Sequence, residues 1–322
     1  MRHILAADIG GTNSRFAHFQ ADATENLVLV GTEWLHTHEA KSFAQLLQQL
    51  GETSFSLSPA DSDAAVFAVA GPVENGRFCK PPNISWDLDL TRDTKRVGLK
   101  QGTLINDFVA QAYACRSPII QDAHQIIPGD VIEDATLAVI GAGTGLGHAA
   151  LVPDGRGGYS AVSSEGGHIS FPFQHPQELD LMRFLLDVTG KAYITTETVV
   201  SGGGLSLVHR FLTGETREPA EVSAAMIPDS ETLRWMARFF ARVCRNYALQ
   251  VLARGGLYIA GGVAAKVPNL VTHAQFASEF RNTETMEHIL GKLPVFLNSN
   301  EESGLWGSAM VGLQMLSRRE PR

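Results

Sequence analysis

Residues 4–19 read ILAADIGGTNSRFAHF, and this stretch does most to decide the fold. It holds an apolar run of strand length, a turn rich in glycine, and a second apolar run. Residues 137–152, LAVIGAGTGLGHAALV, have the same layout. Each stretch is typical of a β-hairpin closed around a glycine loop. The repetition predicts two related α/β units, with chance similarity over so few residues as the alternative.

Strands and helices are expected to alternate along the rest of the chain. Strands are predicted where short apolar runs end at glycine or at a polar pair, over residues 64–70, 103–105 and 257–260. The clearest helix is predicted over residues 231–253, where apolar residues recur at spacings of three or four. Residues 108–115 also have helical character, and the apolar stretch 305–316 is expected to pack as a final helix. This alternation predicts an α/β architecture.

Length and charge limit the classes of function. A chain of 322 residues exceeds the usual size of one hydrophobic core, so two domains are expected. The formal net charge of -8 argues against nucleic acid as a partner, because a duplex-binding protein carries a basic stripe. A nucleotide remains compatible with this charge, since backbone N–H groups alone can bind phosphate.

Cysteine spacing and the N-terminal residues predict a cytoplasmic protein. Cys79, Cys115 and Cys244 are far apart and form no CxxC pair, so neither a zinc cluster nor a disulfide framework is indicated. Asp8 interrupts the first apolar run too early for a signal peptide. No stretch reaches the roughly 18 apolar residues of a membrane span.

The first glycine loop suits a phosphate group. In Gly10 and Gly11 the missing side chains let several N–H groups, including those of Thr12 and Asn13, converge on phosphate oxygens. Asp8, just before the turn, is placed to face a phosphate-bound Mg²⁺ ion, which prefers oxygen ligands. The alternative is a plain hairpin turn whose glycines supply positive φ.

Two further glycine turns follow. Residues 141–147, GAGTGLG, carry more glycine than a turn needs, yet Leu146 breaks the GxGxxG fingerprint. Since the chain also contains no GxxxxGK[ST] sequence, a phosphate loop of a third type is the functional interpretation. Gly261-Gly262 either lets an adenosine group lie against the backbone or connects a strand to a helix.

Polar residues beside these turns are candidates for sugar binding and catalysis. Asp107, after a short strand, could accept a proton from an attacking hydroxyl, although the dipeptide Asn106-Asp107 alone favours a helix N-cap at Asp107. Glu165 and His168, three residues apart, suit neighbouring sugar hydroxyls. Glu197 is either a further sugar ligand or a charge at a helix N-terminus.

Taken together, the motifs resemble the bacterial glucokinase family, in the sugar-kinase branch of the actin-like ATPases. The resemblance covers nearly the whole chain, in order. It rests on DIGGTNSR at 8–15, AGPV at 70–73, NISW at 83–86, INDF at 105–108, GAGTGLG at 141–147, EGGHISF at 165–171, Glu197 with SGGGL at 201–205, and IAGGV at 259–263.

This resemblance implies a two-domain actin-like ATPase (RNase H-like) α/β fold with an interdomain cleft. The small domain would comprise residues 1–110 and 302–322, and the large domain residues 111–301. The implied reaction is phosphorylation of glucose to glucose 6-phosphate, the first step of glycolysis, with Mg²⁺-ATP as donor and a homodimer as the usual assembly. No metal site on the protein itself is implied, because the cysteine-rich zinc motif of the related repressor/kinase family is missing after EGGH.

Roles for individual residues follow from the same resemblance. Asp107 is the implied base. The implied sugar ligands are Asn83, Asn106, Asp107, Glu165, His168 and Glu197. The implied nucleotide-binding residues are Asp8, Gly10, Gly11, Thr12, Asn13, Gly141, Gly143, Thr144, Gly261 and Gly262.

Three alternatives stay open. Many glucokinases have Thr where this chain has Pro82, so a kinase for mannose, fructose or an N-acetylhexosamine is the nearest rival. A sugar-responsive regulator would need a DNA-binding segment before the first glycine loop, for which the residues preceding Asp8 leave no room. An actin-like filament protein would bind ATP but has no use for the EGGH pair.

Overall fold

The computed structural model describes residues 1–318, and the chain divides into two compact units. The first comprises Met1–Gln121 together with the segment from Asn300 onward, and the second comprises Asp122–Ser299. The expected boundary at residue 110 would cut helix α3 (Asp107–Ala114), which the first unit keeps whole. Residues 319–322 of the expected segment 302–322 lie outside the described residues.

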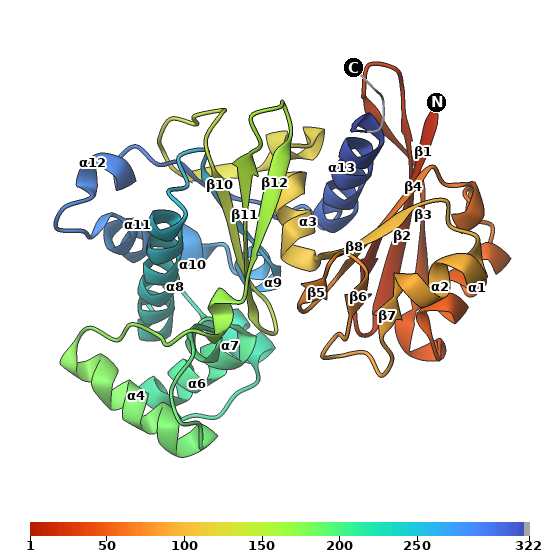
Figure 1. The fold of residues 1–322 in the computed structure, drawn as a ribbon. Helices are drawn as coiled ribbons and strands as arrows, with labels where there is room; N and C mark the ends of the chain where they lie inside the picture. Colours follow the sequence, from red (N-terminus) through yellow and green to blue (C-terminus); the bar gives the residue numbers. More distant parts are fainter. Residues whose placement is uncertain (319–322) are drawn as a thin grey trace. The chain divides into compact units, whose positions relative to one another are not determined.

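The first unit is built on a five-stranded sheet in the order β3-β2-β1-β4-β8 (Figure 1). Its strands are β1 (Arg2–Ile9), β2 (Asn13–Ala21), β3 (Leu27–His36), β4 (Ala64–Val69) and β8 (Gly102–Asn106). β1 and β2 form the predicted antiparallel hairpin, whereas β1, β4 and β8 run parallel to one another. Parallel strands end at the same edge of a sheet, so the residues after β1, β4 and β8 are brought together there.

Alternate residues of β1 serve two separate cores in this unit, as strand geometry requires. Leu5 and Ala7 pack in a core with helices α1 (Phe43–Glu52) and α2 (Leu90–Val97). Ile4 and Ala6 pack on the other face against α13 (Ser303–Ser317), the predicted C-terminal helix. α13 also contacts α3. A small sheet of β5 (Val73–Glu74), β6 (Phe78–Cys79) and β7 (Leu88–Asp89) carries the loop that contains Asn83.

The second unit contains a six-stranded sheet in the order β12-β11-β10-β13-β14-β9. The strands are β9 (His124–Ile127), β10 (Leu137–Ala142), β11 (Leu146–Pro153), β12 (Tyr159–Ser164), β13 (Leu257–Ala260) and β14 (Val295–Leu297). β10 and β11 form the second predicted hairpin, and β10 lies parallel to β13. The two hairpins thus occupy equivalent places in their sheets, each next to a parallel strand, as the repeated sequence layout predicted.

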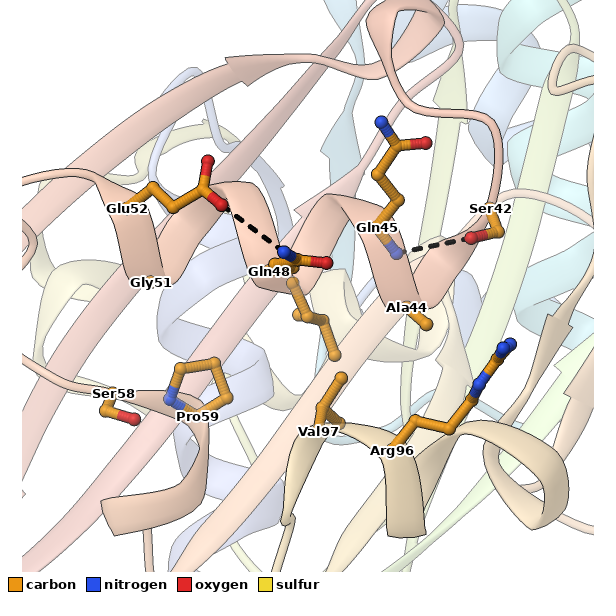
Figure 2. A pocket seen from close by; sticks show the side chains of 11 residues that line it. Ser42, Ala44, Gln45, Gln48, Gly51, Glu52, Ser58, Pro59, Arg96 and Val97 are labelled. Atoms are coloured by element: carbon orange, nitrogen blue, oxygen red, sulfur yellow. Dashed lines mark hydrogen bonds between the residues drawn. The ribbon is translucent and has the colours of Figure 1, made fainter.

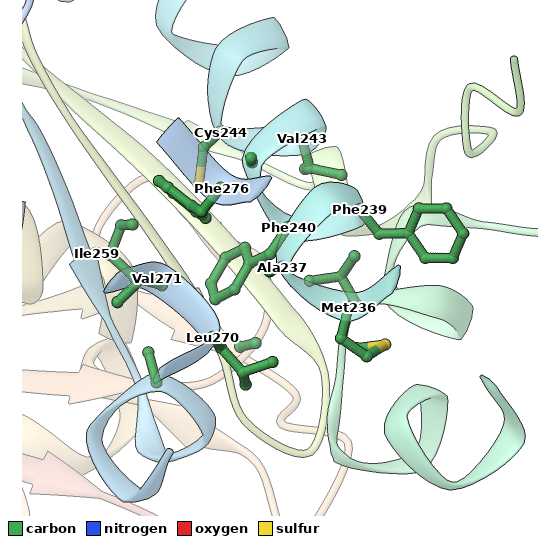
Figure 3. Packing of buried hydrophobic residues seen from close by; sticks show 14 of the residues in the cluster. Met236, Ala237, Phe239, Phe240, Val243, Cys244, Ile259, Leu270, Val271 and Phe276 are labelled. Carbon is green, nitrogen blue, oxygen red and sulfur yellow. The ribbon is translucent and has the colours of Figure 1, made fainter. Parts of the chain in front are cut away.

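Helix α8 (Glu231–Gln250) is the central helix of the second unit. Its apolar residues face a large core, in which Phe240 packs against Phe276 and lies near Leu270 (Figure 3). The helix ends three residues before the predicted limit at residue 253. The other helices of this unit are α4 (Pro176–Thr189), α5 (Thr196–Val199), α6 (Gly202–Thr213), α7 (Pro219–Ala225), α9 (Gly262–Lys266), α10 (Asn269–Thr272), α11 (Ala274–Arg281) and α12 (Glu287–Leu290).

A buried ionic network fastens two of these helices to α8. Arg242, fully buried on α8, donates to the Glu178 carboxylate of α4 at 2.6 Å and to Glu279 of α11 at 3.0 Å. Arg245 contacts Glu279 and Arg238 contacts Glu178. Burial acts to raise the pKa of Glu178, but hydrogen bonding and the charges of the arginines outweigh it and hold the pKa below its usual value. Removing one member would leave an uncompensated buried charge, which makes the network important for stability.

Within residues 1–318, no helix is both long and apolar enough to cross a membrane.

Candidate functional site

The carboxyl edge of the first sheet gathers several of the predicted residues. Ile9, next to Asp8, pairs with Val69, and Val69 pairs with Asn106 on the following strand. The ends of β1, β4 and β8 therefore lie level, with the first glycine loop, Gly71 and the Asn106-Asp107 pair after them. This is the edge where open α/β sheets bind ligands.

Asn106, and not Asp107, caps helix α3. The Asn106 side-chain oxygen accepts from the backbone N–H of Phe108 at 2.9 Å, and its amide nitrogen donates to the carbonyl of Gly71 at 3.2 Å. The interpretation of Asp107 as the cap is therefore wrong, because Asp107 is the first residue inside the helix. A carboxylate in the first turn is favoured by the helix dipole in its charged form, which is the form that a base needs.

Cys79 lies close enough to Asp107 to respond to its charge. Burial raises the pKa of the Cys79 thiol to about 11, and the negative charges of Asp107 and Glu74 add to the effect. The thiol lies near the backbone of Ala70, at the end of β4. The Cys79 thiol is therefore neutral at ordinary pH.

The first glycine loop needs glycine because its backbone is closely packed, and not because of a positive φ. Neither Gly10 nor Gly11 has a positive φ, so the hairpin interpretation that required one is wrong. A Cβ added at Gly11 would lie 2.9 Å from both the Cβ and the carbonyl oxygen of Asn83. At Gly71, which does have a positive φ, an added Cβ would lie 3.4 Å from Cδ of Pro82. The predicted phosphate loop and the predicted sugar loop are therefore in direct contact.

Asp8 forms an ion pair that the sequence analysis did not anticipate. Its Oδ2 lies 2.5 Å from the Arg15 guanidinium, which also donates to the carbonyl of Glu301 at 2.7 Å. A single carboxylate on a phosphate loop still suits Mg²⁺, which binds through one or two carboxylates and keeps several waters. In the described part of the chain, no group of three or more His, Cys, Asp or Glu side chains could hold a metal by itself. Asp8 thus fits an ion that arrives with the nucleotide.

The second and third glycine turns lie side by side in the second unit. Gly141 of β10 pairs with Ala260 of β13, which brings the loops after these strands together. Gly261 has a φ of 87° and lies very close to Ala142. A Cβ added at Gly261 would be 2.6 Å from the carbonyl oxygen of Ala142. By contrast, a Cβ at Gly143 or Gly262 would meet open space. The third turn connects β13 to α9, which confirms the interpretation of Gly261-Gly262 as a strand-to-helix connection.

His168 lies between two carboxylates. Its Nδ1 is 3.2 Å from Glu197 Oε1 and its Nε2 is 3.6 Å from Glu165 Oε2. The side chains of His168 and Glu165 are 60% and 57% exposed, and that of Glu197 is 27% exposed. Such an exposed set of donors and acceptors suits the hydroxyl groups of a sugar.

Glu197 links this set to the second glycine loop. A Cβ added at Gly145 would lie 3.0 Å from Glu197 Oε2, so the carboxylate rests against the loop backbone. The backbone N–H of Gly202, at the start of α6, donates to the carbonyl of Gly143 at 2.9 Å. Predicted sugar ligands and a predicted phosphate loop are therefore adjacent in the second unit as well.

Two residues that the sequence analysis missed support the EGGH turn. Thr196, one residue before Glu197, directs its hydroxyl at the carbonyls of Gly166 (2.8 Å) and Gly167 (2.7 Å). His148 of β11 packs beneath Gly166, where an added Cβ would lie 3.2 Å from the ring Nδ1. His148 ends the sequence GLGH at 145–148, and Thr196 is the middle residue of TTE at 195–197. Both lie next to recognised motifs, but only the fold shows that they support the EGGH turn.

A different hollow, of about 580 Å³, lies on the first unit between α1 and α2 (Figure 2). Its lining includes Gln45, Glu52 and Arg96. None of the predicted site residues line it, so its size alone gives no reason to place the site there.

Comparison with known proteins identifies the family. The family model described as Glucokinase matches residues 5–315. The chain belongs to the glucokinase family. Curated glucokinases from Chromobacterium violaceum and a Synechocystis species are 32% and 30% identical to it. The matches cover 95% and 97% of this chain and 88% and 98% of those relatives.

Solved structures agree with this assignment. A glucokinase from an Antarctic psychrotroph superimposes with a TM-score of 0.83 at 27% identity, covering 98% of this chain and 99% of that one. A ROK hexokinase from Thermus thermophilus has a TM-score of 0.66 at 16% identity and supports the fold alone. The predicted glucokinase resemblance and the predicted α/β actin-like ATPase fold class are confirmed.

Proposed function

We propose that this protein transfers the γ-phosphoryl group of ATP to glucose and releases glucose 6-phosphate and ADP. Membership of the glucokinase family confirms the predicted enzyme class, an ATP-dependent hexose kinase. The observation that carries the proposal is the arrangement around Glu197. Its carboxylate meets His168 on one side and Gly145 of a glycine loop on the other.

Each unit offers polar side chains that suit a sugar. Glu165, His168 and Glu197 would bind hydroxyl groups with their exposed ends, and Asn83 would add a donor and an acceptor. Asn106 uses both ends of its amide on the backbone in this structure, so its contribution would be to position Asp107 as well as to contact the sugar.

Asp107 would act as the base. Its carboxylate would take the proton from the attacking sugar hydroxyl, the hydroxyl oxygen would bond to the γ-phosphorus, and the bond to the bridging oxygen of ADP would break. Its place in the first turn of α3 suits a negatively charged group, because the helix dipole favours negative charge there.

The glycine loops would bind the nucleotide. Gly10, Gly11, Thr12 and Asn13 with Asp8 would face the phosphates in the first unit, and Gly141, Gly143 and Thr144 would do so in the second. Gly261 and Gly262 would lie against adenosine. A ROK glucokinase from Streptomyces griseus was solved with glucose and AMPPNP, at 19% identity, which supports ATP as the donor. Mg²⁺ would neutralise phosphate charge, and Asp8 is the carboxylate beside the first glycine loop that would help to hold it.

The cellular setting is part of the same proposal. We expect a cytoplasmic homodimer that catalyses the first step of glycolysis. Light scattering of the purified protein would test the dimer, for which a mass of one chain, 34.8 kDa, would be the contradicting result.

The reaction is tested by measuring ADP release with Mg²⁺-ATP in the presence of glucose, mannose, fructose or N-acetylglucosamine. We expect turnover with glucose. Turnover with another sugar alone would contradict the choice of glucose and direct attention to Pro82, which packs on Gly71 at the sugar loop. Folded protein that binds ATP but turns over none of the four sugars would contradict the kinase itself.

A further inference from the structure

A small hollow lies beneath the EGGH turn in the second unit. It has a volume of about 90 Å³ and runs between the turn and helix α8. Gly166 and Thr196 line its upper side, and Asn246 and Tyr247 of α8 line the other. His148 of β11 also faces it. The polar side chains that line the hollow are uncharged at neutral pH, and His148, which can carry a charge, can also be neutral.

Two polar atoms at the hollow lack a partner. Within the described residues, His148 Nδ1 and the Tyr247 hydroxyl are buried and have no hydrogen-bonding partner. The His148 and Tyr247 side chains are 2% and 5% exposed. Their rings meet edge to face, with centroids 4.8 Å apart. Buried polar groups in native proteins nearly always find a partner, and leaving one without costs free energy.

The size and chemistry of the hollow select water as that partner. One water needs roughly 10–15 Å³ of such space, and pockets for drug-sized ligands begin at about 300 Å³. The hollow therefore holds water but excludes a sugar. A water molecule can donate to one of the two atoms and accept from the other, and Asn246 offers it a further contact. Burial lowers the pKa of His148 to about 4, so the ring is neutral and one of its nitrogens can accept.

We propose that His148 and Tyr247 bind water in this hollow and that the hydrated pair positions the EGGH turn for the sugar. The second half of this inference rests on the proposed function. The His148 ring packs directly against Gly166, and Gly166 lies between Glu165 and His168. β11 carries His148 and α8 carries Tyr247, so water that fixes the ring against α8 also fixes the turn packed on it. His148 and Tyr247 are then positioning residues that never touch the substrate.

Tyr247→Phe tests the proposal with the least disturbance, because it removes only the hydroxyl. We expect its KM for glucose to rise about tenfold while its KM for ATP stays within about twofold, and its melting temperature to fall. His148→Phe should act in the same direction. His209→Phe is the matched control, since His209 is a second buried histidine of this unit and bonds to Thr232 away from the turn. It should leave the KM for glucose unchanged.

A crystal structure of the wild-type protein at high resolution supplies a readout that does not depend on activity. We expect ordered water within hydrogen-bonding distance of His148 Nδ1 and Tyr247 Oη. A dry hollow, together with a Tyr247→Phe variant that melts higher than wild type, would overturn the water site. Ordered water with an unchanged KM for glucose in both variants would overturn the positioning role. Absence of glucose turnover in the wild type would instead contradict the proposed function and leave the water site to be judged by the structure and the melting temperatures.

Discussion

The hydroxyl of Thr196 offers the sharpest test of how the EGGH turn is held. Thr196→Val replaces the hydroxyl with a methyl group of similar size and removes the donor that serves the carbonyls of Gly166 and Gly167. Thr196 is 1% exposed, so the substitution removes a donor at a buried position. Leaving buried acceptors unsatisfied costs about 1–3 kcal/mol, which is the expected loss in the free energy of unfolding.

Activity should respond more strongly than stability. Glu165 and His168 flank the two glycines, so a turn that loses its tether displaces both proposed sugar ligands together. A displacement on the order of 1 Å can cost about 100-fold in rate. We therefore expect kcat/KM for glucose to fall by roughly 10- to 100-fold, with a KM for ATP close to that of the wild type.

The assay combines urea unfolding, followed by circular dichroism, with steady-state kinetics in both substrates. Thr196→Ser is the control, because it restores the donor and loses only a methyl group. It should recover most of the activity. If Thr196→Val retained the wild-type KM for glucose, or if Thr196→Ser were equally impaired, the tether would not be what places the turn.

Further predictions concern stability. Glu178→Gln should lower the free energy of unfolding by about 3–5 kcal/mol in urea titrations, because Arg242 and Arg238 would lose one buried negative charge and only Glu279 would remain to face Arg242; a loss below 1 kcal/mol would contradict this. Gly307→Ala should cost 1–3 kcal/mol or more by the same measurement, since an added Cβ would lie 2.6 Å from the carbonyl carbon of Ala110 and force α13 from α3; wild-type stability would show that the helices adjust freely. His148 titrates at about 4 in the folded chain and near 6.5 when unfolded, so the unfolded state binds the extra proton first and stability should fall by roughly 3 kcal/mol between pH 6.5 and 4. The His148→Phe variant should lose less free energy of unfolding than the wild type across this pH range. An identical loss would assign the effect to other groups.

Local sequence signals predicted most of the secondary structure that surrounds the site. The hairpins at residues 4–19 and 137–152 are present because each combines two apolar runs with a glycine turn, a pattern set by neighbouring residues. Strand β13 has the predicted bounds 257–260, since the apolar run and Gly261 define it completely. Helix α8 stops before residue 253 because Leu252 takes a positive φ, which apolar periodicity does not reveal.

Contacts between distant segments could not be predicted in the same way. The dipeptide Asn106-Asp107 favoured Asp107 as the cap, but the choice of Asn106 depends on the carbonyl of Gly71, 35 residues earlier in the chain. The reason for glycine at position 11 is Asn83, on another loop. Thr196 likewise acquires its role only when α5 is packed beside the EGGH turn. Sequence motifs named the residues, and tertiary packing decides which of them meet.

The role of Asp107 is the central claim, and Asp107→Asn tests it most directly. The variant keeps the size of the side chain and an oxygen that can accept from the Phe108 N–H, but it cannot take the hydroxyl proton. Asp89→Asn is the matched control, because Asp89 also lies at a helix start, where it caps α2 through Thr91 and Arg92. In a coupled assay of ADP release with glucose, we expect Asp107→Asn to lose about 10²- to 10⁴-fold in kcat with its fold intact and the control to keep its kcat. A kcat near that of the wild type in Asp107→Asn would show that another group takes the proton.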